Sequence, residues 1–98
     1  MNGSLTIEEI DELLVGMKIA RAKLQHAKNT LQERYKNLFQ GCVTAQTEKN
    51  KPRAIIYANE AARVQDFSAR LTQSIETVDG AIQALLSLEE IPPTPNPV

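Results

Sequence analysis

The polar stretch Thr47-Glu48-Lys49-Asn50-Lys51-Pro52 lies at the middle of a 98-residue chain and separates two long segments without proline, 1–46 and 53–91. Asparagine suits a helix terminus, and Pro52 suits the first turn of a second helix, where its missing N–H is not needed. Two segments of nearly equal length joined by so short a connection favour helices that fold back on each other. The stretch therefore predicts an antiparallel helical hairpin.

Apolar residues recur every seven positions on both sides of this stretch, which is typical of a coiled-coil seam. The predicted seam consists of Ile10, Met17, Leu24, Leu31, Leu38, Val64, Leu71, Val78 and Leu85, with Ala45 and Tyr57 continuing the repeat. Further apolar residues are expected to widen it, namely Leu13, Leu14, Ala20, Ala27, Tyr35, Cys42, Ala61, Phe67, Ile75 and Ile82. The fold class is all-α, a long coiled-coil-like hairpin of two helices.

The limits of the two helices follow from local signals. Thr6 followed by Glu9 can form a capping box, so the first helix is expected over about 6–49. The second is expected over about 52–91, because Pro92 and Pro93 stop it. Residues 1–5 are expected to be disordered, and the proline-rich residues 92–98 to form an extended linker or a docking peptide. Gly41 is expected to face Ala58 and Ala61, whereas Gly16 and Gly80 occupy outer positions.

The composition excludes several classes of function. The formal net charge of −1 argues against polyanion binding driven by overall charge, and only four aromatic residues offer no platform for nucleic-acid bases. No apolar run reaches the roughly 18 residues that span a bilayer.

The single Cys42 cannot form an internal disulfide, which is consistent with the reducing environment of the cytoplasm. We expect it to be a small apolar residue packed against its neighbours. His26, the only histidine, has no carboxylate or thiol at helical spacing. We expect no catalysis, cofactor or metal.

Charge is distributed unevenly along the chain. Residues 1–17 and 71–98 contain eight acidic residues and no basic one, whereas residues 18–70 contain all eleven basic residues and four acids. Folding the chain in two predicts a rod with a negative open end and a positive closed end. One flank of the first helix is predicted to be basic, through Lys18, Arg21, Lys28 and Lys36. This basic flank suits an anionic membrane surface, the acids of a neighbouring subunit, or simple solubility.

A two-helix hairpin has one internal seam and seldom buries enough apolar surface to be comfortably stable alone. Apolar side chains are also expected beside or outside the seam, at Ile19, Val43, Ile55, Ile56, Leu86 and Leu88. We therefore expect dimers, tetramers or filaments of the chain. The alternative is a small helical adaptor or chaperone-like module that shields a partner helix.

The start of the second helix resembles a known family. The stretch Arg53-Ala54-Ile55-Ile56-Tyr57-Ala58-Asn59-Glu60-Ala61-Ala62-Arg63 is similar to the corresponding helix of the CdvB family of archaeal ESCRT-III-like cell-division proteins. The most specific part is Tyr57-Ala58-Asn59-Glu60, and Leu31-Gln32-Glu33-Arg34-Tyr35-Lys36-Asn37-Leu38-Phe39 resembles the close of that family's first helix.

This resemblance implies a hairpin core of the ESCRT-III type that polymerises with itself and with related paralogues. It implies a cytoplasmic location, peripheral at the membrane or division site, and a role in cytokinesis or vesicle budding. It also implies remodelling by an AAA-type ATPase. In the family, further helices and the ATPase-binding motif follow the hairpin. Because this sequence ends at Val98, we expect a core fragment without that motif.

Overall fold

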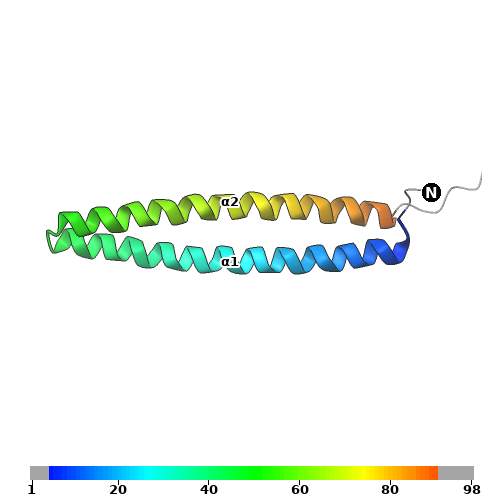
Figure 1. Cartoon of the computed structure of the whole chain (residues 1–98), viewed down its shortest axis with the longest axis horizontal. Helices are drawn as coiled ribbons and strands as arrows, with labels where there is room; N and C mark the ends of the chain where they lie inside the picture. Colours follow the sequence, from blue (N-terminus) through cyan, green and yellow to red (C-terminus); the bar gives the residue numbers. More distant parts are fainter. Residues whose placement is uncertain (1–4, 91–98) are drawn as a thin grey trace, which may run out of the picture.

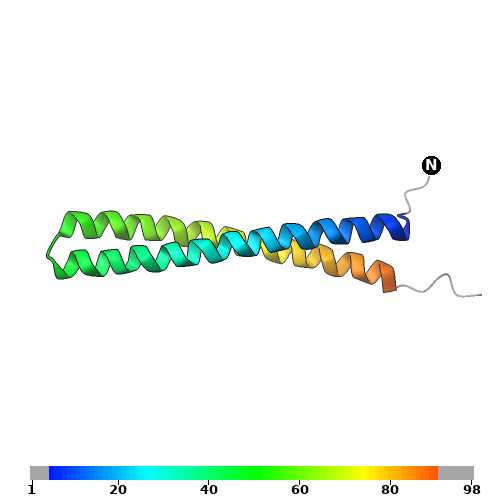
Figure 2. The same cartoon turned by 90° about the horizontal axis from the view of Figure 1, so that it is seen from below.

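The computed structural model describes residues 5–90 and consists of two long helices, α1 (Ile7–Thr47) and α2 (Lys51–Glu90). The helices run antiparallel, side by side along their whole length (Figure 1), and cross near the middle of the rod (Figure 2). At 1.5 Å per residue each is about 60 Å long. The predicted all-α hairpin is confirmed, with helix limits within a few residues of those expected. The predictions for residues 1–4 and 91–98 lie outside the described residues.

The predicted capping box begins α1. Glu9 donates its backbone N–H to Thr6 Oγ1 at 3.1 Å, and Thr6 donates its own N–H to Glu9 Oε1 at 2.8 Å. These hydrogen bonds satisfy two amide groups that the helix itself leaves free. The bond from the Thr6 backbone N–H, reinforced by the Thr6 side chain, lowers the pKa of Glu9. The start of the hairpin is therefore fixed by local contacts.

The turn between the helices contains only Glu48, Lys49 and Asn50. Lys49 has a left-handed backbone (φ 59°), and its N–H donates to the Gln46 carbonyl oxygen at 3.0 Å. The Asn50 N–H donates to the Ala45 carbonyl oxygen at 2.8 Å, which completes a Schellman ending of α1. Asn50 Oδ1 then accepts the N–H of Arg53 at 3.2 Å. Asn50 thus both completes α1 and caps α2, so the chain reverses within three residues.

The seam follows an unbroken alternation of three- and four-residue steps on both helices, which is the spacing of a coiled coil. On α1 it is formed by Ile10, Leu14, Met17, Arg21, Leu24, Lys28, Leu31, Tyr35, Leu38, Cys42 and Ala45. On α2 it is formed by Ala54, Tyr57, Ala61, Val64, Ser68, Leu71, Ile75, Val78, Ile82 and Leu85. All of these side chains are buried or half-buried, and the nine residues predicted for the seam are among them.

Four of the residues predicted to widen the seam were placed wrongly. Leu13, Ala20, Ala27 and Phe67 are exposed, and the corresponding seam positions belong to Leu14, Arg21, Lys28 and Ser68. The regular spacing selects these positions whatever their polarity. Long basic side chains can occupy such positions because their aliphatic stems cover apolar surface while the charge stays in water.

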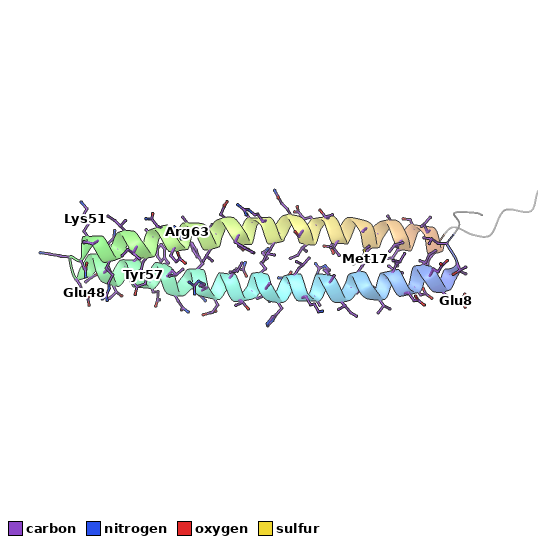
Figure 3. All side chains as sticks on the ribbon, in the orientation of Figure 1. Glu8, Met17, Glu48, Lys51, Tyr57 and Arg63 are labelled. Atoms are coloured by element: carbon purple, nitrogen blue, oxygen red, sulfur yellow. The ribbon has the colours of Figure 1, made fainter. Side chains whose placement is uncertain are left out.

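The seam is thin. A cluster of Ile10, Leu14, Ile82 and Leu85 packs near the open end of the rod, but even Leu14 keeps 5% of its surface exposed. Most side chains along the rod point outward into solvent (Figure 3). The predicted exposure of apolar residues outside the seam is confirmed for Ile19, Val43, Ile55, Ile56 and Leu88. Leu86 lies beside the seam, half-buried against the apolar cluster.

Gly41 allows close contact between the helices, but with a different neighbour from the predicted alanines. A Cβ atom at Gly41 would lie 2.9 Å from Cε1 of the Tyr57 ring. Tyr57 lies between the helices near the turn (Figure 3). A Cβ atom at Gly16 or Gly80 would meet nothing within 4 Å, so these two glycines occupy outer positions as predicted.

Candidate self-association surface

Few titratable or nucleophilic side chains lie close together in residues 5–90. Within residues 5–90 no three His, Cys, Asp or Glu side chains gather to hold a metal ion. His26 is exposed, and the half-buried Cys42 thiol donates to the Ala54 carbonyl oxygen at 3.4 Å. Neither described helix contains an apolar stretch sufficient to cross a membrane.

The predicted basic flank divides into two kinds of position. Arg21 and Lys28 are half-buried at the seam, whereas Lys18 and Lys36 are exposed. The Arg21 guanidinium holds both oxygens of Asp79, through Nε to Oδ1 and through its terminal nitrogen to Oδ2 at 3.3 Å. These hydrogen bonds and the adjacent negative charge raise the pKa of Arg21. Arg21 therefore contacts α2, and Lys18 and Lys36 are the members of the flank that project freely.

The charges separate along the rod, although less sharply than along the sequence. We define the open half as residues 7–27 and 72–90 and the closed half as residues 28–71. The open half contains eight acids and three basic residues, a formal charge of −5, because Lys18, Arg21 and Lys23 lie there. The closed half contains eight basic residues and four acids, a formal charge of +4. The rod therefore has two halves of opposite sign.

The stretch from Arg53 to Arg63, singled out in the sequence, lies in the first turns of α2. Tyr57 faces the seam against Gly41, and the Arg53 N–H is held by the Asn50 cap. Glu60 accepts from Arg34 of α1 and from Arg63 of its own helix, each at 3.4 Å. Ala58 and Asn59 are exposed. The stretch thus combines contacts that hold the hairpin together with a free outer surface.

An apolar groove runs along one flank of the closed half from the turn toward the middle of the rod. We call it the turn groove, and its lining comprises Tyr35, Phe39, Cys42, Gln46, Ala54, Ile55, Ala58, Ala62 and Gln65. It consists of two joined hollows of about 480 and 280 Å³, which share Cys42 and Ala58. The half-exposed Phe39 ring stacks on Tyr35 with centroids 6.3 Å apart and forms one wall. Lys49 and Lys51 line its end at the turn.

Sequence reasoning did not find this groove. Of its lining residues, Ile55 was recognised as an apolar residue outside the seam, but Phe39 was noted only for the family resemblance. The available signal was the pair of small residues Ala58 and Ala62, one helical turn apart on α2. Their small side chains leave the hollow between the helices open. That signal becomes useful only when the register of the two helices is known.

Comparison with protein-family models, with curated proteins and with solved structures gave no match for this chain.

Proposed function

We propose that this chain is a subunit of a self-assembling scaffold that polymerises through its helical hairpin. The role suggested for the polymer is membrane remodelling in archaeal cell division or vesicle budding. The observation that carries the proposal is the apolar surface that the hairpin leaves uncovered. Eleven large apolar residues of the described chain are exposed, namely Leu5, Ile7, Leu13, Val15, Ile19, Phe39, Val43, Ile55, Ile56, Phe67 and Leu88.

This exposure favours association because covering apolar surface stabilises a complex by roughly 25 cal/mol per Å² before the costs of association. Single exposed apolar residues are common, but here they recur along a rod whose interior is a single thin seam. A second hairpin laid alongside would cover them and would widen the core into a bundle. Association therefore supplies the packing that two helices alone lack.

The separated charges support the same proposal by favouring one relative arrangement of the copies. Two rods aligned in parallel would place −5 beside −5 and +4 beside +4. A shifted or reversed neighbour instead places the closed half of one rod against the open half of the other. Charge patterns of this kind contribute mainly to specificity and register.

Peripheral binding to an anionic membrane is the second part of the proposal. Exposed basic residues available for it include Lys18, Lys36, Lys49, Lys51 and Arg53. Each contributes about 1 kcal/mol close to an anionic surface, so a single hairpin binds weakly and a polymer binds firmly. The resemblance to the CdvB family supports a cytoplasmic place at the division site. It also supports related paralogues as partners, whereas remodelling by an AAA-type ATPase belongs to the full-length family, whose binding motif this chain is expected to lack.

A small helical adaptor is the second candidate, and the turn groove is the observation that favours it. A groove lined by Ile55, Ala58 and Phe39 can hold one apolar face of a partner helix. An adaptor of this kind forms a small complex of fixed size. A scaffold instead grows as its concentration rises, so the two candidates differ in a measurable way.

The test is sedimentation of the purified chain over a hundredfold concentration range, followed by electron microscopy with and without vesicles of phosphatidylcholine and phosphatidylserine. We expect species that grow with concentration and filaments that cosediment with anionic vesicles. The Lys18→Glu/Lys36→Glu variant should lose vesicle binding while its circular dichroism stays unchanged. A chain that remains monomeric throughout the range would reject the scaffold, and a single small oligomer would favour the adaptor.

A further inference from the structure

Two flanks of the hairpin can be told apart by following residues at seven-residue spacing. Arg34 lies on the same line of α1 as Leu13, Ala20 and Ala27, and Glu60 lies on the same line of α2 as Phe67, Ala81 and Leu88. Because Arg34 and Glu60 form an ion pair between the helices, these two lines share one flank of the seam. The turn groove lies on the other flank of the hairpin. Its residues Phe39 and Ala58 are on the side of the seam residues Tyr35 and Ala61 that faces away from Arg34 and Glu60.

On the first of these flanks the open half carries its own apolar surface, which we call the open-end patch. It comprises Leu13, Ala20, Ala27, Ala81, Ala84 and Leu88, where Ala84 lies one helical turn from both Ala81 and Leu88. Leu13 is 43% exposed and Leu88 47% exposed. In the closed half the same flank carries the exposed Phe67 beside the charged residues Arg34, Glu60 and Arg63. The turn groove and the open-end patch thus lie on opposite flanks and in opposite halves of the hairpin.

We propose that the turn groove of one hairpin receives the open-end patch of a second copy. The proposal rests on the scaffold function above and specifies its contact. The leucines Leu13 and Leu88 supply the side chains that fill the hollows beside Ala58 and Ala62. The alanines of the patch allow the helices of the two copies to approach closely.

Charge selects a second copy as the occupant. Lys49 and Lys51 line the groove at the turn, and Lys36 lies beside Phe39 farther along the same flank. The patch belongs to the half of the rod with a formal charge of −5; Glu9 lies one helical turn from Leu13 at its outer end, and Lys23 lies one helical turn from Ala20 and Ala27 at its inner end. Seating the patch in the groove therefore brings opposite charges together as apolar surface is covered.

The contact joins two different surfaces, so it does not close on itself by a twofold axis. Every added copy presents a free groove at one end of the assembly and a free patch at the other. Such a head-to-tail contact generates an open chain of hairpins, each shifted along the rod relative to the last. A symmetric contact between identical surfaces would stop at a dimer.

Two double variants test the proposal without disturbing the seam. Ala58→Glu/Ala62→Glu blocks the groove with bulk and with charge that repels the open half. Ala20→Arg/Ala84→Arg blocks the patch with bulk and with charge that repels the closed half. All four alanines are exposed, so both variants should fold with unchanged circular dichroism and melting temperature. Matched controls change outer residues of the same half by the same charge: Gln40→Glu/Asn59→Glu and Gln73→Arg/Ser87→Arg.

We expect each blocked variant alone to stay monomeric at concentrations where the wild type and the controls assemble. An equimolar mixture of the two variants should form a complex of two chains and grow no further, because the pairing uses the one intact groove and the one intact patch and leaves only blocked surfaces free. Sedimentation velocity and light scattering measure these masses. If the wild type assembles and the blocked variants assemble equally well, the assigned contact is wrong and the scaffold function stands. A wild type that never assembles overturns both.

Discussion

At the scale of single residues, the glycines of the two helices have different surroundings. Gly41 lies against the Tyr57 ring, whereas Gly16 and Gly80 face open space. Glycine in a helix interior costs about 1 kcal/mol relative to alanine, because the unfolded backbone is more flexible. The cost at Gly41 is offset by the contact that a side chain there would prevent. At the other two positions no contact offsets it.

We expect Gly16→Ala and Gly80→Ala each to raise the free energy of unfolding by about 1 kcal/mol. Gly41→Val should lower it by about 1–3 kcal/mol, since the Tyr57 ring must leave its position. Urea unfolding followed by circular dichroism at low protein concentration measures all three values. A Gly41→Val variant as stable as the wild type would show that the ring yields freely.

In the turn between the helices, Lys49 has a backbone conformation that glycine adopts more easily than lysine does. Lys49 adopts φ 59°, a conformation that costs residues with a Cβ about 1–2 kcal/mol. Lys49→Gly is therefore expected to stabilise the hairpin by about 1 kcal/mol. Thermal unfolding by calorimetry provides the measurement, and Lys51→Gly, which places glycine at the start of α2, serves as the control that should destabilise. No gain from Lys49→Gly would contradict the Schellman geometry described here.

At the scale of the elements, the sequence was sufficient to predict both helices, their direction and the nine seam residues. Proline, asparagine and the seven-residue repeat act locally, so they can be recognised without a structure. The seam of α1 also contains a second set of residues at seven-residue spacing, and this set was harder to predict. It consists of Leu14, Arg21, Lys28, Tyr35 and Cys42. Hydrophobicity favoured Ala20 and Ala27, but the regular spacing from Leu14 places Arg21 and Lys28 there. The partner that makes Arg21 acceptable, Asp79, is 58 residues away in sequence, so no local pattern pairs the two residues.

Lys28 and Arg21 occupy equivalent positions along the seam, but only Arg21 is bound there to a carboxylate, that of Asp79. Replacing each of them by leucine should therefore have different effects on stability. Lys28→Leu should raise the free energy of unfolding by about 1 kcal/mol, because added apolar surface is partly covered. Arg21→Leu should gain less, since it leaves Asp79 without the guanidinium that holds both its oxygens. The double variant Arg21→Leu/Asp79→Ala should recover the difference. Chemical denaturation compares the variants, and an equal gain from both single replacements would indicate that the Arg21 pair contributes nothing.

At the scale of the whole molecule, the sequence predicted a negatively charged open end and a positively charged closed end. The structure changes where the boundary between the two charges lies. Lys18, Arg21 and Lys23 belong to the open half, which reduces its negative charge and moves part of the basic flank away from the turn. The turn groove was not predictable, because it depends on which residues of α1 and α2 lie opposite each other. Its small lining residues carry no signal by themselves.

The opposite charges of the two halves predict how assembly responds to salt. Electrostatic attraction between exposed groups is screened over about 10 Å at 0.1 M salt and about 3 Å at 1 M. Raising sodium chloride from about 0.05 to about 0.5 M should therefore increase the protein concentration needed for assembly by roughly tenfold or more. The helicity of the hairpin should change little, because its seam is mainly apolar.

In the Lys36→Glu/Lys51→Glu variant the closed half loses its positive charge, so its assembly should be weak at low salt and nearly independent of the salt concentration. Sedimentation velocity at several salt concentrations measures both chains. If salt instead strengthens assembly of the wild type, apolar contacts outweigh the charges, and the two halves do not set how neighbouring rods are placed.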